Sequence, residues 1–401
     1  MYIGYDKDQD ALRRELRAYY DDLLTPSIRA ELRVEHGIGP RTREIVRQMG
    51  KDGWLGIGWP TEYGGQGRSE IEQFVFFDES MRAQAPVPML TVNTVGPTLM
   101  LNGNDEQRKR FLPKILAGEV HFCIGYSEPA AGTDLAALQT RADLAPDGSG
   151  DFIVNGQKLW TSLASDADYC WLAVRTDQEA AKHGGRAMML VGMKTPGIRV
   201  DQLELLSAHD IAAVFYDDVR VPKENLVGGL NQGWKLITGQ LNHERVTLCA
   251  PGMIEGSYDA VVAWAKETKR PDGRRVIDDE WVQVNLAKVK AGIHALRLLN
   301  WKVAWTAAEG RKLNPADAST IKVFGTEFFL DAFRLLMEVM GQRGYLRPDT
   351  NENLPHETVA NGMIETLYRS LLILTFGGGT NEIQRDLIGL FGLGLPRIPR
   401  M

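Results

Sequence analysis

DFIVNGQKLWTS, residues 151–162, is the stretch that decides the fold, because the pattern around it differs from the rest of the chain. It places Asn155 and Gly156 between two short apolar runs, and an Asn-Gly pair in that setting predicts a β-hairpin. Three short segments rich in Val, Tyr or Phe follow, separated by turn residues: YCWLAVR (169–175), AMMLVGM (187–193) and AAVFYDDVRV (212–221). We therefore predict an antiparallel, barrel-like middle domain over residues 122–230.

The chain before this domain has the pattern of helices. Apolar residues recur at helical spacing from Leu12 to Leu23. Residues 53–67 (GWLGIGWPTEYGGQG) are too rich in glycine for a helix and predict a loop. Helices are expected again at 71–83 and at 105–117, where Asp105 is placed to cap the first turn. We predict an N-terminal helical domain over residues 1–121.

After Gly233 the chain is predicted to be helical nearly to its end. Long helices with short connections are typical of a bundle, so we predict a C-terminal four-helix bundle over residues 231–401. The fold class is then α+β and multi-domain, with helices on both sides of a β domain. The expected helices are 234–269, 279–308, 316–339 and 358–376, with a short last one at 386–391.

The composition excludes several classes of partner. The 401 residues carry 46 Lys and Arg against 52 Asp and Glu, and this net charge of −6 offers no attraction to nucleic acid or anionic lipid. No apolar run approaches the roughly 18 residues of a membrane span, and the charged N-terminus is not a secretory signal. Three scattered cysteines suit a reducing compartment. We expect a soluble, cytoplasmic protein without nucleic-acid or membrane partners.

Several common motifs are absent from the sequence. There is no G-x-G-x-x-G after a predicted strand, no G-x-x-x-x-G-K-[ST] and no G-x-S-x-G. The seven His are scattered and there is no C-x-x-C, so no metal site is predicted. A redox cofactor would have to be held by something other than a Rossmann unit.

The segment GYSEPAAGTDLAAL (125–138) is dense in small residues and hydroxyls. Gly132, Thr133 and Asp134 are suited to present backbone N–H and hydroxyl donors to an anion. Taken alone, the segment is equally suited to be a connector, and that interpretation is the commoner one.

Three motifs together are more specific. GYSEPAAGTDLAAL, GQKLWTS and GGTNEIQRDLIG resemble, in order and spacing, the flavin-contacting motifs of the acyl-CoA dehydrogenase family. WPTEYGG and DDVRVPKENLVG match as well, so the resemblance covers essentially the whole chain. It implies an N-terminal helical domain, a middle β domain and a C-terminal four-helix domain, with FAD as the cofactor.

The resemblance implies a set of FAD contacts. Ser127 matches the hydroxyl that hydrogen-bonds the flavin ring, with Tyr126 beside it, and Thr133, next to Gly132, matches the hydroxyl near the pyrophosphate. Trp160 and Ser162 match the Trp-x-Thr/Ser that packs on the isoalloxazine, although a Trp at such a place is more often in the core. The matching residues of the C-terminal loop are Thr380, Glu382 and Gln384, for which a helix cap is the alternative.

The catalytic base is the most informative position. Removing the α-proton of a CoA thioester requires a carboxylate whose pKa is raised by apolar surroundings. Many family members carry this Glu in the C-terminal loop, where the present chain has Gly378. A subset similar to isovaleryl- and long-chain acyl-CoA dehydrogenases carries it on a helix, and the matching residue is Glu244.

The helical pattern supports Glu244 independently. Trp234, Ile237, Leu241, Glu244 and Leu248 follow one another at helical spacing, which places Glu244 on the apolar stripe. A glutamate paired with Arg on a solvated face is the commoner arrangement, but the stripe and the empty loop position favour the base. By resemblance, the neighbouring Asn242 and Arg245 contact the CoA portion, although an intrahelical ion pair is as good an interpretation of the arginine.

The sequence departs from the homotetrameric members at the contacts that one subunit donates to its neighbour's FAD. Lys269 and Asp272 stand where those members have Arg and Phe, and Glu338 and Gln342 stand where they have Gln and Gly. A carboxylate facing a pyrophosphate is electrostatically unfavourable. The chain most resembles the larger, base-bearing subunit of the heteromeric (α2β2) acyl-CoA dehydrogenases of actinobacterial steroid catabolism, in which a smaller homologous subunit supplies these contacts.

The function implied is therefore FAD-dependent dehydrogenation of a CoA thioester of a sterol or bile-acid side chain, with an electron-transfer flavoprotein as acceptor. Three alternatives remain: a dehydrogenase of medium or branched fatty acyl-CoA, an oxidase or monooxygenase whose flavin reacts with oxygen, and a non-catalytic subunit. The last is disfavoured, because both a flavin-ring motif and a candidate base are present.

Overall fold

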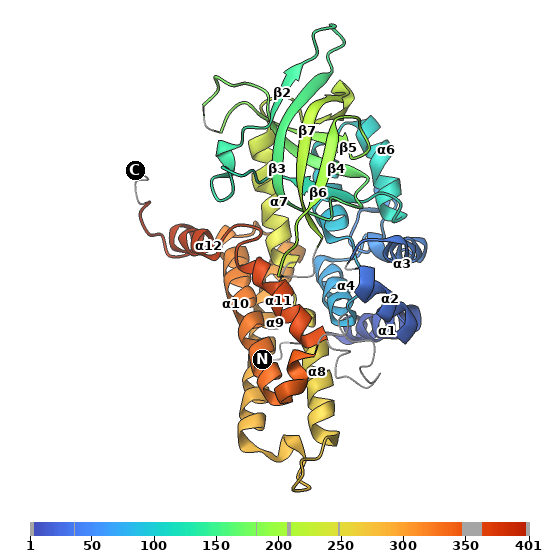
Figure 1. The fold of residues 1–401 in the computed structure, drawn as a ribbon, viewed down its shortest axis with the longest axis vertical. Coiled ribbons are helices and arrows are strands. Elements are labelled where there is room, and N and C mark those ends of the chain that lie inside the picture. Colours follow the sequence, from blue (N-terminus) through green and yellow to red (C-terminus); the bar gives the residue numbers. More distant parts are fainter. Residues whose placement is uncertain are drawn as a thin grey trace.

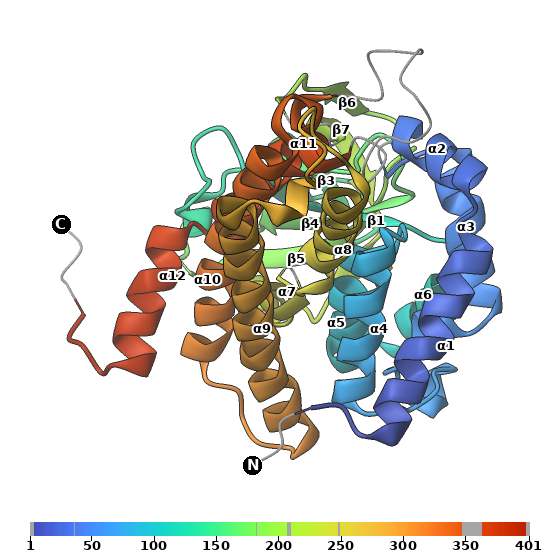
Figure 2. The ribbon, with the colours of Figure 1, turned by 90° about the horizontal axis from the view of Figure 1, so that it is seen from below.

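The computed structural model describes residues 4–35, 37–181, 183–206, 210–247, 249–346 and 363–397, with the backbone alone for residues 241–247. Figures 1 and 2 show three parts in space: N-terminal helices on one side, a strand-rich part, and a group of long C-terminal helices. The order of helices, strands and helices is as the sequence predicts. In the described part of the chain, none of the helices has the length and apolarity that crossing a membrane requires.

The N-terminal helices begin where the sequence provides caps. Asp6, Ser69 and Asn104 each accept a backbone N–H at the start of a helix, and each forms a reciprocal capping box. The predicted cap at Asp105 is therefore wrong by one residue, because Asn104 is the residue with extended backbone there. The helices are α1 (Lys7–Leu23), α2 (Pro26–Glu35), α3 (Pro40–Lys51), α4 (Glu70–Ala83), α5 (Gly96–Asn102) and α6 (Asp105–Leu116).

Short turns connect these helices. The glycine-rich stretch 53–67 contains only the one-turn segments η1 (Trp54–Gly56) and η2 (Thr61–Tyr63), which confirms that it is not an α-helix. A π-helical segment, η3 (Leu90–Val95), leads into α5 and is almost wholly buried. Among its neighbours is Trp59, whose indole donates to the carbonyl of Val92 at 3.1 Å.

The middle part is one mixed, eight-stranded sheet. Its hydrogen-bonded path runs β6-β7-β3-β2-β4-β5-β8, with β1 joined to β4. Most pairs are antiparallel, but β1 and β2 both pair with β4 in parallel. The strands are β1 (Phe122–Gly125), β2 (Arg141–Leu144), β3 (Phe152–Ser162), β4 (Tyr169–Arg175), β5 (Arg186–Gly192), β6 (Ile198–Gln202), β7 (Ile211–Val221) and β8 (Leu226–Val227).

The predicted closed, antiparallel barrel is therefore wrong in two respects: the sheet is mixed, and its path is open, ending at β6 and β8. The physical reason is that side chains, rather than a closing ladder, join its two halves. Residues of β3 and β7 share one apolar core with residues of β4 and β5. In that core the Tyr216 hydroxyl lies 3.4 Å from the sulfur of Cys170.

The predicted hairpin at Asn155 and Gly156 is also wrong. β3 runs unbroken through both residues, and its register with β7 shifts there as at a bulge. Asn155 exchanges two 2.9 Å hydrogen bonds with Asp218, which lies in the left-handed region. A Cβ on Gly156 would lie 2.7 Å from the Thr140 backbone, so the glycine is required by close approach of the neighbouring chain rather than by a turn.

The central strands are buried on both faces, which explains their continuous hydrophobic runs. Trp171 and Ala173 of β4 belong to the core shared with the N-terminal helices, while Leu172 and Val174 belong to the core inside the sheet. β5 alternates in the same way. The period of two thus builds two cores and attaches the N-terminal helices to the sheet.

The C-terminal part consists of long helices. The predicted helix 234–269 is divided in two, since Pro251 caps the start of the second segment and cannot continue the first. α8, α9, α10 and α11 share one apolar core, and the four-helix bundle itself stays a prediction. Residues 358–362 of the predicted helix 358–376 lie outside the described residues. The helices are α7 (Gly233–Thr247), α8 (Gly252–Glu267), α9 (Glu280–Ala308), α10 (Pro315–Met340), α11 (Met363–Leu371) and α12 (Asn381–Leu387).

Candidate active site

The Ser127 loop, residues 126–134, follows β1 directly. It is attached to β3 by a 2.8 Å hydrogen bond from the Leu159 N–H to the Ser127 carbonyl. Because Leu159 is adjacent to Trp160, the structure brings the first two predicted flavin motifs together. Gly132 and Thr133 lie further along the loop and are exposed, and no atom lies within 4 Å of a Cβ built on the glycine.

A buried ion pair stabilises the Ser127 loop. The Lys158 ammonium lies 2.8 Å from Glu128, and their side chains are 0% and 6% exposed. The same ammonium donates to the Tyr126 carbonyl at 3.1 Å, and Glu128 also accepts the N–H groups of Gln139 and Thr140. Burial by itself would raise the pKa of Glu128, but the Lys158 charge and these hydrogen bonds hold it below its ordinary value.

The indole of Trp160 points away from the protein core. The side chain is 55% exposed, and the residue has a φ of 63°, which is uncommon for a residue other than glycine. A second register shift between β3 and β7, from Lys158 to Thr161, turns the side chain out of the sheet. Core packing, the usual role of such a Trp, is therefore not its role in this structure. Ser162 follows at the end of β3 and is half-buried.

The predicted residues of the C-terminal loop lie at and within α12, which packs on α10. Thr380 caps α12 by accepting the Ile383 N–H, so the alternative interpretation as a helix cap describes its geometry. Glu382 is exposed, whereas Gln384 is fully buried and accepts a 2.8 Å bond from Ser319. Within the part of the chain that the structure describes, the Gln384 amide nitrogen has no hydrogen-bond partner. Among the described residues, no hydrogen bond joins these three side chains to the Ser127 loop.

The candidate base lies on α7. The backbone of Asn242, Glu244 and Arg245 is helical, and their side chains lie outside the described residues, as does Leu248 of the predicted stripe. The preceding turn of the helix is buried against the sheet and the N-terminal helices through Ile237, which agrees with the predicted stripe.

A hydrogen-bonded bridge connects the Ser127 loop to α7. The Tyr126 hydroxyl donates a short hydrogen bond to the Gln240 side-chain oxygen, and the Trp171 indole donates to that hydroxyl at 3.2 Å. Gln240 lies one helical turn before Glu244. The structure thus joins the helical turn before the candidate base to the loop that carries the candidate flavin contact.

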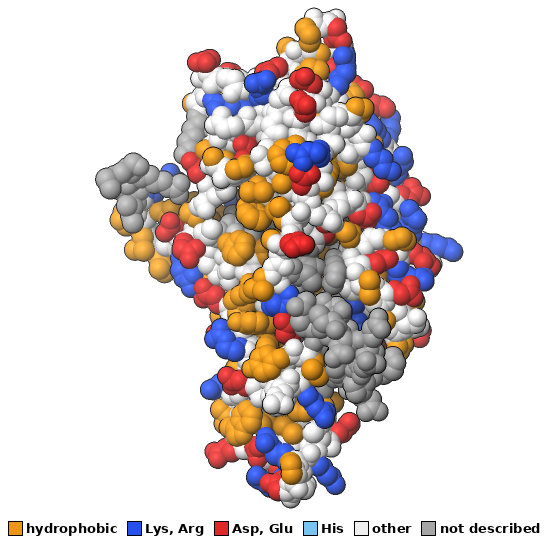
Figure 3. All heavy atoms as spheres, in the orientation of Figure 1, with side chains coloured by type: hydrophobic (Ala, Val, Ile, Leu, Met, Phe, Trp, Pro, Cys, Tyr) orange, Lys and Arg blue, Asp and Glu red, His pale blue; other side chains and the backbone are white. Residues whose placement is uncertain are grey.

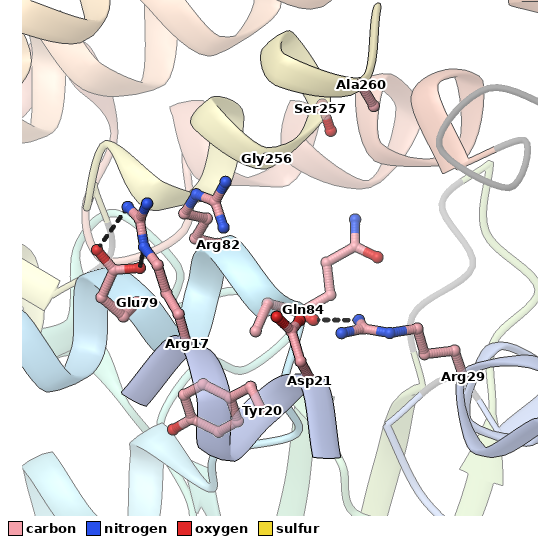
Figure 4. A pocket seen from close by; sticks show the side chains of 11 residues that line it. Arg17, Tyr20, Asp21, Arg29, Glu79, Arg82, Gln84, Gly256, Ser257 and Ala260 are labelled. Carbon is pink, nitrogen blue, oxygen red and sulfur yellow. Dashed lines mark hydrogen bonds and ion pairs between the residues drawn. The ribbon is translucent and has the colours of Figure 1, made fainter. Parts of the chain in front are cut away.

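A cavity elsewhere is unsuited to an acyl group. It has a volume of about 190 Å³ and lies between α1, α4 and α8 (Figure 4). Its walls are mostly charged or polar, and Arg17 already pairs with Glu79 at 2.7 Å. It contains none of the predicted site residues. Among the described residues, we also find no cluster of three His, Cys, Asp or Glu side chains that would hold a metal ion.

Models of the three acyl-CoA dehydrogenase domains match the chain in order. The N-terminal domain matches residues 6–119, the middle domain 123–219 and the C-terminal domain 231–391. The chain belongs to the acyl-CoA dehydrogenase family. The resemblance recognised in the sequence is confirmed, and the chain has the fold of an oxidoreductase family whose members use FAD.

Relatives within this acyl-CoA dehydrogenase family match along their full length. Acyl-CoA dehydrogenase FadE26 of Mycobacterium tuberculosis is 51% identical over 408 residues, covering 100% of both chains. A solved structure of the ChsE4-ChsE5 complex from the same organism contains a chain of 51% identity with a TM-score of 0.90, covering 99% of this chain and 100% of that one. The Tcur3481-Tcur3483 steroid ACAD gives 45% identity and a TM-score of 0.92 at the same coverage.

Three of the four positions at which this acyl-CoA dehydrogenase departs from homotetrameric members contact other residues of the chain. Asp272 accepts bonds from Arg274 at 3.0 Å, and Glu338 accepts one from Asn285 at 3.0 Å. Lys269 forms an isolated backbone bridge with Arg275, and Gln342 is exposed. The carboxylates of Asp272 and Glu338 therefore both accept hydrogen bonds from residues of the same chain.

Sequence reasoning missed two residues that shape the site, Lys158 and Gln240. A signal existed for the first, because Lys158 follows Phe152 and Val154 at a period of two and therefore points inward, where a lysine requires a carboxylate. Gln240 gave no such signal, because an amide on a helix is ordinary until its buried partner is known.

Proposed function

We propose that the chain is the base-bearing subunit of a heteromeric (α2β2), FAD-dependent acyl-CoA dehydrogenase that forms an α,β double bond in the CoA thioester of a sterol or bile-acid side chain. The observation that carries the proposal is the bridge from Tyr126 to Gln240, which attaches the Ser127 loop to α7. The complexes named above, one of them a steroid ACAD, support the heteromer and the class of substrate. The division at 1–121, 122–230 and 231–401 is part of the proposal, and the matched domain ranges support it.

The residues present fit FAD. The exposed indole of Trp160 offers a flat apolar surface for an aromatic ring, and Ser127 is attached to the adjacent strand. The open space at Gly132 leaves room for a phosphate next to Thr133. The buried amide of Gln384 is a donor with no acceptor among the described residues, and with Thr380 and Glu382 it would contact the cofactor at the C-terminal loop. When bound there, FAD supplies the acceptor for the hydride that leaves the β-carbon of the substrate.

The chain's own contribution to the chemistry is proton transfer. In our proposal the Glu244 carboxylate removes the α-proton, a step that requires a base in apolar surroundings, and the buried Ile237 lies on the same predicted face of the helix. Arg245 and Asn242 would contact the CoA portion, the arginine through a charge-assisted bond to a phosphate. An electron-transfer flavoprotein would then reoxidise the enzyme.

The outer surface of α9 has features that favour binding of a protein partner. On one side of α9 the exposed apolar residues follow one another at intervals of three or seven, which is the pattern of a seam between helices, and the exposed Lys288, His294 and Lys302 lie between them. Trp281 and Trp305, at its two ends, are 47% and 51% exposed. Figure 3 shows hydrophobic side chains in a band on the side where the C-terminal helices lie. We call Trp281, Val284, Ala291, Leu298 and Trp305 the α9 outer face.

Co-expression with a homologous chain encoded next to it tests this function. We expect the pair, but not the single chain, to purify as a flavin-containing heterotetramer that reduces a dye acceptor with steroid side-chain CoA thioesters. A fully flavinated, active homotetramer from the single chain would refute the heteromer. Preference for medium or branched fatty acyl-CoA would refute the steroid substrate, and rapid reoxidation of the reduced enzyme by air in stopped flow would favour an oxidase or monooxygenase.

A further inference from the structure

The direction of the hydrogen bonds between Trp171, Tyr126 and Gln240 determines how the Gln240 amide is oriented. An indole N–H is only a donor, so the Tyr126 hydroxyl accepts from Trp171 and has its own proton to give. That proton goes to the Gln240 oxygen, because the nitrogen of an amide is not an acceptor. The NH₂ group of Gln240 therefore faces away from Tyr126.

This NH₂ group is a buried donor without a partner among the residues that the structure describes. Gln240 is 2% exposed. An unsatisfied buried donor is destabilising, and native proteins keep few of them. Such a group, aligned by a neighbouring hydrogen bond, points to an acceptor supplied by a ligand.

The position of Gln240 restricts what that ligand atom is. Its hydrogen-bond partner Tyr126 precedes Ser127, and Glu244 follows one turn later on the same helix. The surroundings belong to the apolar core that contains Trp171 and Ile237, with Tyr126 packed against it. A CoA phosphate is too strongly charged for such a place, whereas a thioester carbonyl is a small, neutral acceptor adjacent to the carbon that loses its proton.

We propose that the side-chain amide of Gln240 donates a hydrogen bond to the thioester carbonyl oxygen of the bound acyl-CoA. The inference rests on the proposed function. As the α-proton moves to the Glu244 carboxylate, negative charge develops on this oxygen, and a preoriented donor stabilises it. Tyr126 acts through Gln240 as a positioning residue.

Binding of two non-reacting ligands tests the contact without turnover. A 2,2-dimethylacyl-CoA has no α-proton to lose, and its S-alkyl counterpart carries CH₂ in place of the carbonyl. For the flavin-loaded wild-type complex we expect the acyl ligand to bind about tenfold more tightly than the alkyl ligand. In Gln240→Met, which keeps the volume and removes the donor, this ratio should fall to about threefold or less.

Two further variants keep the test decisive. Tyr126→Phe leaves Gln240 in place but removes the group that orients it, so the ratio should fall between those of wild type and Gln240→Met. Gln48→Met, at a half-buried amide whose nitrogen donates to the Asp52 carboxylate, should leave the ratio unchanged. A wild-type ratio in Gln240→Met overturns the inference, and if that variant does not fold, a wild-type ratio in Tyr126→Phe does so. If the variants keep the wild-type ratio of acyl-ligand to alkyl-ligand affinity while the enzyme still dehydrogenates acyl-CoA, only this inference is overturned. If the flavin-loaded wild-type complex dehydrogenates no acyl-CoA, the proposed function is overturned.

Discussion

The ammonium of Lys158 lies 2.8 Å from the carboxylate of Glu128, and both side chains are buried in the middle of the candidate site. The two residues lie in two different flavin motifs, one before β2 and the other within β3. Their ion pair joins two sequence motifs through residues that are 30 positions apart, and it stabilises the Ser127 loop.

Replacement of Lys158 by Met should destabilise the protein by about 3–5 kcal/mol, because it leaves the Glu128 carboxylate buried without its cation. We expect a lower melting temperature and loss of flavin on gel filtration. Lys109→Met, at a 75% exposed lysine, is the matched control and should change stability by less than about 0.5 kcal/mol. The double variant Lys158→Met/Glu128→Gln should be more stable than Lys158→Met, and equal stability would contradict the ion-pair argument.

Trp160 should matter for the cofactor and not for the apoprotein. Trp160→Gly removes an exposed side chain and relieves a left-handed backbone, so the flavin-free protein should be stabilised by roughly 0.5–1 kcal/mol. The same variant should retain less FAD, as measured by absorbance after dialysis. The contrasting variant Trp171→Ala empties a fully buried position and should cost about 3–5 kcal/mol. Unimpaired FAD retention in Trp160→Gly would remove the indole from the cofactor site.

Glu244→Gln should lower turnover by roughly 100-fold or more, because general-base catalysis contributes on the order of 10²–10⁴. The flavin content and melting temperature should stay those of the wild type, since the substitution preserves shape. Glu267→Gln, at an exposed carboxylate at the end of α8, is the control and should retain full activity. Retained turnover in Glu244→Gln with bound FAD would show that the base lies elsewhere.

The α9 outer face should be needed for assembly but not for folding. Trp281→Glu and Trp305→Glu place charges on exposed positions, so the isolated chain should keep its melting temperature. In the co-expressed complex the same variants should shift the elution toward smaller species, because a charge would be desolvated at the seam. The control is Leu101→Glu, at another exposed apolar residue outside the face. Normal assembly of the double Trp variant would exclude α9 from the interface.

Local signals predicted the elements well where packing did not compete with them. The helical pattern found α4 and α6 to within one residue at each end. The hairpin predicted from Asn155 and Gly156 was wrong because an Asn-Gly pair suits a β-bulge as well as a turn. The choice between the two depends on the long pairing of β3 with β7, which the local sequence does not reveal. The open edges of the sheet were unpredictable for a related reason, since closure depends on how two halves pack over Cys170 and Tyr216 rather than on any strand's own pattern.

The candidate site shows the same division. Ser127 and Trp160 were found by motif, and the structure brings their segments together. The bond between Tyr126 and Gln240 joins residues 114 positions apart, so it depends on how the sheet sits against α7. Sequence periodicity describes a helix face, but it does not say which residue of another element meets that face.

Asp78 gives a pH-dependent test of how the N-terminal helices attach to the C-terminal ones. Its carboxylate, on α4, accepts the Gly252 N–H at 2.5 Å, and burial raises its pKa to about 7, against the opposing charge of Arg297. Because this pKa is raised in the folded state, the native protein binds the proton more tightly than the unfolded chain does. Stability from this group is therefore present below about pH 4 and is lost as the pH rises through about 7.

Asp78→Asn keeps the oxygen that accepts from Gly252 and removes the titration. The melting temperature of the variant minus that of the wild type should thus increase from pH 4.5 to about pH 7 and then stay level. Asp105→Asn, at a side chain that is 82% exposed on α6, is the matched control for the same change at the surface. If the Asp78→Asn difference were constant across this range, the carboxylate would have to be ionised in the folded protein throughout, and the bond to Gly252 would then be one between an anion and an amide.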